Sequence, residues 1–303
     1  MRAVGNYILH NRMQAITVLS LVTIIAMWLP QFAYPLSGVP VALVTLRRGG
    51  VPGMQVMLGS LLLTLLFTLL VQIKAPVTLI FALGIWLPVW FASMVLRTTS
   101  SQGMMVLSAG AIGILFLVVL QLALGDTSGL WKSWLDFWLE QSIPVNKQDE
   151  FRKLLESALP LMNAMLATSI VMSLVLTVLL GRWWQSRLFF PGEFRSEFQR
   201  LRIHHALSYP ILVCVIALMV KDELQQTLLR DVLVIALFLY LFHGVAAVHR
   251  VVNSKGLSQA WLLAMYGLLI LLLPQMVVFL VCLGIIDAWM GRKRSGADGK
   301  DQA

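Results

Sequence analysis

The charged residues of this chain lie almost entirely in short breaks between long apolar stretches. Of its 303 residues, 59% are apolar and only 12% are charged, and the mean hydropathy is +0.83. A soluble domain carries about 25% charged residues, so the composition excludes that class. A helix of about 20 apolar residues spans the hydrocarbon core of a bilayer. The pattern therefore predicts an all-α, polytopic bundle of transmembrane helices.

Seven stretches are clear candidates for membrane segments, and two proline-containing regions allow more than one interpretation. Residues 33–46 form a short apolar stretch, and Pro274 divides the long stretch 257–289. Pro274 marks either a hairpin between two short helices or a kink in one helix. We expect about 8–10 membrane segments in a single transmembrane domain, residues 1–290. The clear candidates are 13–29, 52–72, 76–96, 103–124, 157–180, 206–220 and 231–248.

The distribution of Lys and Arg favours the hairpin and orients the chain. With ten segments, sixteen of the 23 Lys and Arg residues fall in breaks on one side and seven on the other. Cation-rich loops face the cytoplasm. The sequence thus predicts a multi-pass protein of the bacterial inner membrane with both termini in the cytoplasm, and a basic, disordered tail at 291–303. Because the cations flank apolar runs and form no single arm, we expect the lipid bilayer as a partner and no nucleic acid.

Two polar stretches separate the membrane segments. The outer stretch, 125–156, contains Trp131, Trp134 and Trp138 at helical spacing, which predicts an amphipathic helix in the headgroup layer. Ile143-Pro144 separates this helix from a second amphipathic piece that leads into the next span. The cytoplasmic stretch, 181–205, is cationic, and we expect a helix over 193–205. This helix either lies on anionic lipid or docks a cytoplasmic partner, and the sequence leaves both open. Its candidate contact residues are Phe194, Arg195, Phe198, Arg200 and Arg202.

The sequence contains no motif for catalysis or metal binding. Neither H-E-x-x-H, G-x-S-x-G, Walker A nor C-x-x-C occurs. All carboxylates lie in breaks, in the tail or near helix ends, as Asp231 and Asp287 do. A carboxylate at mid-membrane costs about 2.5–3.5 kcal/mol to insert, so one present there would signal function. We therefore predict no enzyme, no catalytic residue, no metal and no cofactor. Asp287 either pairs with a neighbouring cation or helix end or serves a function.

A few polar groups inside the apolar stretches are candidates for ligand contacts. His243 is the ionisable side chain nearest the middle of a span, and Tyr240 lies three residues earlier on the same helical face. The pair forms either a small polar pocket or a hydrogen-bonded contact between helices. Asn163 follows Pro160 at the outer start of a helix. Ser37 and Gly38 lie in a proline-glycine segment that either forms an outer loop or lines a cavity.

Two resemblances to known families follow from particular segments. The proline-glycine segment 34–40, with the turn Arg47-Arg48-Gly49-Gly50, resembles the substrate-binding subunits of energy-coupling-factor vitamin transporters. The whole chain resembles the DUF2232 (YybS-like) integral membrane family. That resemblance rests on Pro191-Gly192-x-Phe194-Arg195-x-Glu197-Phe198-x-x-Leu201-Arg202, and on Leu273-Pro274 followed by Leu283 to Asp287.

The resemblances imply an architecture and a class of function. The vitamin-transporter subunits hold a small molecule under an outer loop and depend on a separate energising complex. This chain has about four more membrane segments than those subunits. We expect it to bind, or help to move, a small neutral or apolar solute together with such a complex. The expected pocket residues are Ser37, Gly38, Asn163, Tyr240 and His243. The alternative is a non-enzymatic scaffold or assembly protein of the envelope that acts through helix 193–205.

Overall fold

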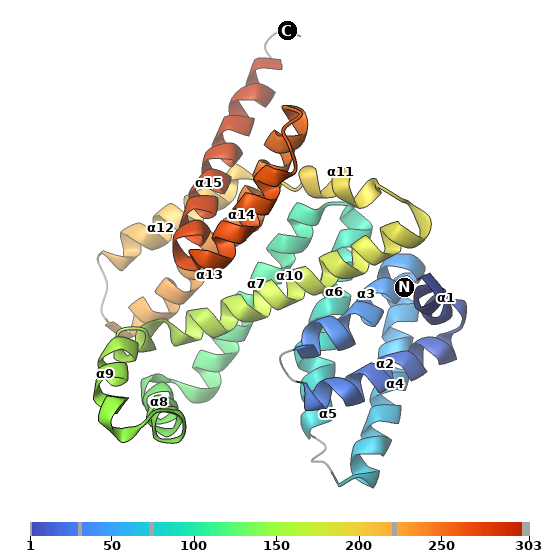
Figure 1. The fold of residues 1–303 in the computed structure, drawn as a ribbon, viewed down its shortest axis with the longest axis horizontal. Coiled ribbons are helices and arrows are strands. Elements are labelled where there is room, and N and C mark those ends of the chain that lie inside the picture. The colour runs from blue at the N-terminus through green and yellow to red at the C-terminus, as the bar shows by residue number, and fades with distance from the viewer. Residues whose placement is uncertain (1, 30–31, 73–75, 220–222, 299–303) are drawn as a thin grey trace.

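The computed structural model describes residues 2–29, 32–72, 76–219 and 223–298 (Figure 1). For Tyr34, Pro35, 223–226 and 291–298 it describes the backbone only. The described residues are helical almost throughout, and no strand occurs among them, which confirms the predicted all-α class. Six helices are long and apolar enough to cross a membrane. They are Gly50–Leu70, Pro76–Thr99, Gln102–Leu124, Leu159–Phe189, Thr227–Ser254 and Leu273–Met290.

The N-terminal helices surround a short helix, α3, that is buried along its apolar length. Helix α3 (Val39–Arg48) follows the π-helical turn η2 (Tyr34–Gly38), and its residues from Val39 to Leu46 are all buried. A helix that is apolar on every side is stable only when neighbours cover it completely. The covering helices include α2 (Arg12–Trp28), α4 (Gly50–Leu70), α6 (Leu87–Thr99) and α10 (Met162–Phe189).

Cationic side chains close the turn that follows α3. Arg97 donates to the carbonyl of Leu46 at 2.5 Å, and Arg48 donates to the carbonyls of Leu9 and His10. The last carbonyls of a helix have no partner within the helix, so these guanidinium groups satisfy them. Gly49, at φ +104°, makes the turn into α4. The first helix, α1 (Arg2–His10), is thereby tied to the α3–α4 turn.

Helix α10 connects the two ends of the molecule (Figure 1). One face carries Ala164, Ala167, Val171, Leu174 and Val178, all fully buried, at the spacing of three and four that lines one helical face. Helix α10 packs against α3 and α6 on one part and against α7 (Gln102–Leu124) and α13 (Glu223–Ser254) on another. At 28 residues it is about 42 Å long, so the features at its two ends are far apart.

The polar stretch 125–156 forms the predicted pair of helices. Helix α8 (Ser128–Ser142) and helix α9 (Val145–Glu156) are separated at Ile143 and Pro144. Their contact is reinforced by an ion pair between Asp136 and Arg152. Helix α8 buries Leu135 and Leu139, whereas Trp134 is half exposed. The buried face thus comprises two leucines, and the Trp134 indole remains outside, where an interfacial helix places it.

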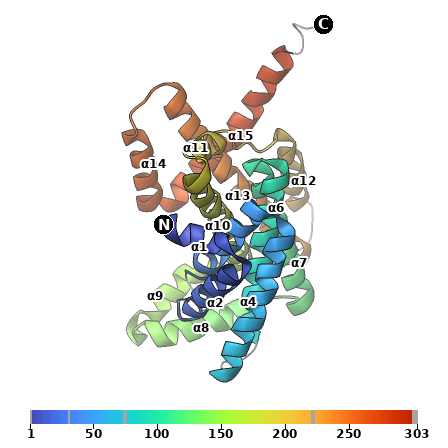
Figure 2. The ribbon, with the colours of Figure 1, turned by 90° about the vertical axis from the view of Figure 1, so that its right-hand side faces the viewer.

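The C-terminal region confirms the hairpin interpretation at Pro274. Helix α14 (Ala260–Leu271) is separated by Leu272 alone from helix α15 (Leu273–Asp298). The two helices contact each other near this junction and diverge away from it (Figure 2). The backbone of 291–298 continues α15, where the sequence predicted a disordered tail, because extending an existing helix adds one hydrogen bond per residue. Residues 299–303 of that tail lie outside the described residues.

The predicted cationic helix 193–205 is wrong in its extent. Helix α11 spans Glu193–Gln199 only, and the backbone from Leu201 to His204 is not helical. Leu201 and Ile203 are each 1% exposed, so two alternate side chains of this extended piece are buried. In a helix, residues two apart lie on different faces, whereas in extended backbone they lie on the same face. Because Leu201 and Ile203 are both buried, the backbone here is extended. The remaining elements are α5 (Pro76–Phe81), η3 (Ala82–Trp86), η4 (Leu159–Leu161), η5 (His205–Leu207) and α12 (Ser208–Leu218).

Candidate functional site

His243 lies at the crossing of α13 and α15, where it joins three parts of the chain. The backbone N–H of Ile203 donates to Nδ1 of His243 at 3.2 Å. On the other side of the ring, Nε2 lies 2.8 Å from Oδ2 of Asp287. Since Nδ1 accepts a hydrogen bond, the ring proton is on Nε2, which donates it to the carboxylate. Both nitrogens of His243 are therefore used within the protein.

Asp287 is shared between His243 and a cation. A terminal nitrogen of Arg250 donates to the same Oδ2 of Asp287 at 2.6 Å, and the other one donates to the carbonyl of Gln199 at 2.7 Å. The side chains of His243, Arg250 and Asp287 are 1%, 22% and 26% exposed. We call these three residues the clasp. The clasp ties α15 to α13 and to the segment after α11, with Asp287 paired to the neighbouring cation Arg250.

Two glycines allow α13 and α15 to cross closely at the clasp. A Cβ atom on Gly244 would collide with the backbone carbonyl of Leu280, and one on Gly284 would collide with that of Tyr240. Such close backbone contact between helices requires small residues. Tyr240 is fully buried, and its ring stacks toward His243 with centroids 6.3 Å apart. The predicted shared face of Tyr240 and His243 is thus present, and it packs between helices.

Ser37 and Gly38 also lie within packed protein. The hydroxyl of Ser37 donates to the carbonyl of Ala33 at 2.6 Å, and the Ser37 side chain is fully buried. A Cβ atom on Gly38 would meet Thr177 at 2.6 Å and Val89 at 3.1 Å. The π-helical turn η2 therefore brings its backbone against α6 and α10.

Asn163 belongs to a polar cluster beneath α8. Its Oδ1 accepts hydrogen bonds from the Thr127 hydroxyl at 3.1 Å and from the Trp131 indole N–H at 2.7 Å. Its amide nitrogen lies 2.9 Å from the Thr127 oxygen. Thr127 precedes α8 and Trp131 lies in its first turn, whereas Asn163 lies in the first turn of α10. The cluster thus fixes the start of α8 over the start of α10.

A buried carboxylate adjoins this cluster. Asp231 of α13 interacts with Asn163, and its side chain is only 2% exposed. Its Oδ1 lies 3.9 Å from Nε of Arg230, and neither atom has a hydrogen-bond partner among the described residues. Arg230 also donates to the carbonyl of Pro160. The Asp231 carboxylate is therefore held between a cation and an amide with capacity for further hydrogen bonds.

A pocket of about 340 Å³ opens at this cluster, and we call it the α8 pocket. Asn163 is the one predicted ligand residue that lines it. The other predicted ligand residues, Ser37, Gly38, Tyr240 and His243, do not, so the structure does not bring the five together in one site. The α8 pocket is lined by Asp126, Thr127, Ser128, Gly129, Trp131, Lys132, Leu159, Pro160, Asn163, Thr227 and Arg230.

Asp126 at the rim of the α8 pocket is held in its charged form. The backbone N–H of Ser128 donates to Asp126 at 2.9 Å, and the Ser128 hydroxyl donates to it at 2.7 Å. These two hydrogen bonds, the backbone one foremost, lower the pKa of Asp126 below its usual value of 3.8. The rim therefore carries a fixed negative charge at neutral pH.

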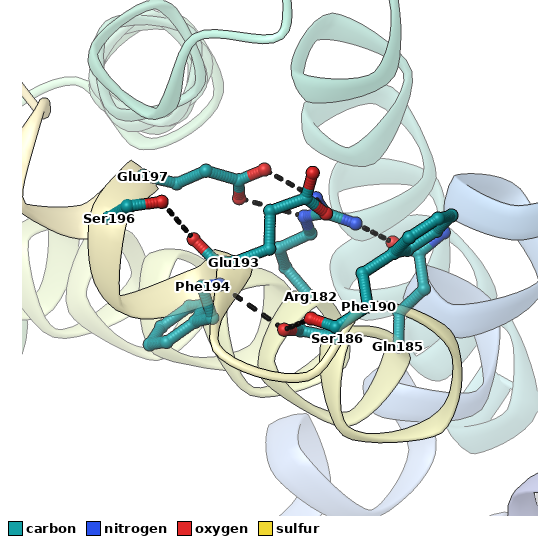
Figure 3. Close-up of polar contacts among 8 residues, drawn as sticks. All are labelled: Arg182, Gln185, Ser186, Phe190, Glu193, Phe194, Ser196 and Glu197. Atoms are coloured by element: carbon teal, nitrogen blue, oxygen red, sulfur yellow. Dashed lines mark hydrogen bonds and ion pairs between the residues drawn. The ribbon is translucent and has the colours of Figure 1, made fainter.

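The acidic residues of α11 are held by a single arginine of α10 (Figure 3). Arg182 pairs with both oxygens of Glu197 and donates to Glu193 at 2.9 Å. A guanidinium bound to carboxylates in this forked way fixes direction as well as distance. In addition, the Phe194 and Phe198 rings stack at 6.1 Å and pack against the core. The phenylalanines predicted to contact lipid or a partner are thus used inside the protein.

The predicted contact arginines after α10 remain at the surface. Arg195, Arg200 and Arg202 are all exposed. Arg195 donates to Oδ1 of Asn253 at 3.0 Å. It also lines a pocket of about 430 Å³, which we call the Arg195 pocket. Arg230 near the start of α13 lines the α8 pocket, whereas Asn253 near the end of α13 lines the Arg195 pocket, so the two pockets lie toward opposite ends of this helix.

Comparison with known proteins gives no relative of this chain. No family model, no curated protein and no solved structure matches it. The resemblances to the DUF2232 family and to vitamin-transporter subunits stay predictions. Among the described residues, no three His, Cys, Asp or Glu side chains are grouped so as to hold a metal ion.

The sequence did not predict the roles of Thr127 and Arg230, which line the α8 pocket, or of Asp231, which adjoins it. Thr127 and Arg230 lie at the ends of polar breaks, and Asp231 was placed at the start of a span. Helix α13 begins eight residues earlier, at Glu223, so Asp231 lies inside a helix and faces Asn163. An acidic residue next to an arginine at the start of an apolar run is the signal that identifies such a position.

Proposed function

We propose that this chain binds a small solute in the α8 pocket and acts with a separate partner that moves or receives it. The observation that carries this proposal is the buried Asp231–Asn163 pair adjoining a 340 Å³ pocket beneath an amphipathic helix. Ligand sites are concave, mostly apolar and equipped with a few convergent polar groups, and their volumes start at about 300 Å³. The α8 pocket has that composition and the size for a small solute.

The charges around the α8 pocket favour a solute without net charge. Lys132 and Arg230 contribute two positive charges to the lining, and Asp126 contributes one negative charge. The buried Asp231, beside Asn163, contributes a second negative charge next to the pocket. With the charges balanced, an ion of either sign gains little, whereas a neutral or zwitterionic solute finds donors and acceptors. The Trp131 indole offers an apolar surface beside them.

The membrane setting of the proposal rests on the sequence. The six long apolar helices make the chain a multi-pass membrane protein. We further propose the bacterial inner membrane, with both termini and the Arg195 pocket in the cytoplasm and the α8 pocket outside. The excess of Lys and Arg in alternate breaks supports this orientation. The chain has no ATP-binding motif, which is the reason to propose a separate energising partner.

Native mass spectrometry of the chain, extracted gently from its own membrane, tests the proposal. We expect a reproducible small-molecule adduct on the wild-type chain and on Asn253→Ala, a control at the other pocket. The adduct should be lost in Asn163→Ala and weakened in Thr127→Val, which removes one hydroxyl while keeping the side chain's shape. An unchanged melting temperature of Thr127→Val shows that folding is intact. An adduct retained equally by both pocket variants, or absent from wild type, would contradict the proposal.

A second candidate function is a scaffold that docks an envelope protein through the exposed arginines. The observation in its favour is that Arg195, Arg200 and Arg202 are exposed while the acids of α11 are bound by Arg182. This leaves a net positive surface. Reversing all three charges to Glu should release a crosslinked protein partner from cells. Partners that remain crosslinked to the triple variant would exclude this function.

A further inference from the structure

An apolar groove lies among α13, α14 and α15. The last two of these helices diverge from their junction (Figure 2). Its volume is about 320 Å³. Every residue that lines it is apolar, or contributes an apolar surface as Trp261 does. Residues that face it include Val248, Val252, Trp261, Ala264, Leu268 and Phe279. A groove of this kind fits a hydrocarbon chain, and no polar ligand would gain from entering it.

The Arg195 pocket adjoins this groove. Val252 and Leu257 line both, so the polar space and the apolar space meet at these two residues. On the polar side lie Arg195, Asn253 and Gln259. Trp261, at 63% exposed, lies in the first turn of α14, close to where the two spaces meet. An indole at such a boundary is typical of the layer where lipid headgroups and acyl chains meet.

The polar side of this combined site is suited to an anion. Among the residues whose side chains the structure describes, no carboxylate lines either the groove or the Arg195 pocket. Arg195 donates one hydrogen bond to Asn253, and a guanidinium has five N–H donors, so donors remain for a phosphate. Arginine binds phosphate with paired, charge-assisted hydrogen bonds. The Asn253 amide in turn donates to the Gln199 side chain at 3.1 Å, which orients the group that holds Arg195.

We propose that the groove and the Arg195 pocket form one site for a single anionic glycerophospholipid. Its phosphate lies against Arg195, and one acyl chain lies between α14 and the α13–α15 pair. The lipid fills the space that the diverging hairpin leaves open and fixes α14 against the bundle. The site lies toward the opposite end of α13 from the α8 pocket and does not depend on a solute binding there.

Retention of phosphatidylglycerol by the full chain, compared with phosphatidylcholine, tests this proposal. The chain is exchanged into detergent micelles with equal amounts of the two lipids and examined by native mass spectrometry. We expect one phosphatidylglycerol per chain. Arg195→Gln should retain it at least about tenfold more weakly, since a hydrogen bond to a charged group is lost. Arg200→Gln, which removes an exposed arginine at the end of α11 that does not line the site, should retain it as wild type does.

The groove is tested by a pair of substitutions on α14. Ala264→Phe fills the groove and should reduce lipid retention, whereas Leu263→Phe, on an exposed face of the same helix, should not. Adding sn-glycerol 3-phosphate, which carries the phosphate without acyl chains, should displace nothing. The proposal is overturned if phosphatidylcholine is retained equally, if Arg195→Gln behaves as Arg200→Gln does, or if Ala264→Phe retains the lipid. Displacement by sn-glycerol 3-phosphate would also overturn it, because that result makes the site one for free phosphate.

Discussion

Replacing Asp287 with alanine removes the acceptor that joins His243 to Arg250 in the clasp. The Nε2–H of His243 and one N–H of Arg250 lose their partner, at 2.8 and 2.6 Å. A hydrogen bond to a charged group contributes about 1.5–3 kcal/mol, and breaking a buried ion pair from one side costs about 3–5 kcal/mol. Because the Arg250 and Asp287 side chains are 22% and 26% exposed, water can solvate the groups left without a partner and so reduces the free-energy cost of the substitution. We expect Asp287→Ala to lower the free energy of unfolding by about 2–4 kcal/mol.

The assay is reversible unfolding in mixed micelles, followed by circular dichroism. Asp287→Asn keeps an oxygen acceptor without the charge and should cost less than Asp287→Ala. The matched control is Asp149→Asn, an exposed carboxylate on α9, which should change the free energy by less than about 0.5 kcal/mol. In a double-mutant cycle, Asp287→Ala and Arg250→Met should show coupling of about 1–2 kcal/mol. Equal stability of Asp287→Ala and Asp149→Asn would refute the role given to the clasp.

Three further predictions concern other parts of the fold. Gly244→Ala should lower the free energy of unfolding by about 1–3 kcal/mol, because the added Cβ meets the Leu280 carbonyl. In the same unfolding assay, Gly267→Ala on α14, where the added Cβ has open space, should leave the free energy of unfolding unchanged or raise it. Arg182→Lys should release α11 from α10, since one ammonium group cannot hold Glu193 and Glu197 together. We expect faster proteolysis between α10 and α11 in this variant, and an unchanged proteolysis rate would contradict the role given to Arg182. Asp126 should titrate below 3.8 in carboxyl NMR, and Ser128→Ala should move its pKa back toward that value. The lowered pKa means that the contribution of Asp126 to stability is present above the unfolded pKa and is lost as pH falls through the folded one; an Asp126 pKa that Ser128→Ala leaves unchanged would contradict the assigned cause.

The sequence predicted those features that depend on hydropathy and local backbone chemistry. Apolar length identified the membrane helices, and Pro144 and Pro274 marked breaks that the structure contains. Each of these follows from a run of residues or from a proline, so no knowledge of distant contacts is needed. The candidate Asn163 was identified in the same way, as an amide at the start of an apolar helix.

The partners of the polar groups could not be predicted, because they depend on how helices cross. His243 meets Asp287 and the backbone of Ile203 from positions 44 and 40 residues away in the chain. That meeting requires the close approach at Gly244 and Gly284, and neither glycine alone indicates which helix it faces. The extended backbone after α11 was missed for the same reason. Leu201 and Ile203 are buried by tertiary packing, which overrides the helical pattern of the preceding residues.

A photoreactive residue at position 129 tests the proposed function most directly. Gly129 lines the α8 pocket, and a Cβ there would meet nothing within 4 Å, so a photoreactive phenylalanine derivative fits at this position. The labelled chain is irradiated in its own membrane and the modified peptide is analysed by mass spectrometry, with the same label at the exposed Glu150 of α9 as a control. The account predicts a small-molecule adduct at position 129 and none at 150. A crosslink to another protein at position 129, or the same products at both positions, would contradict it.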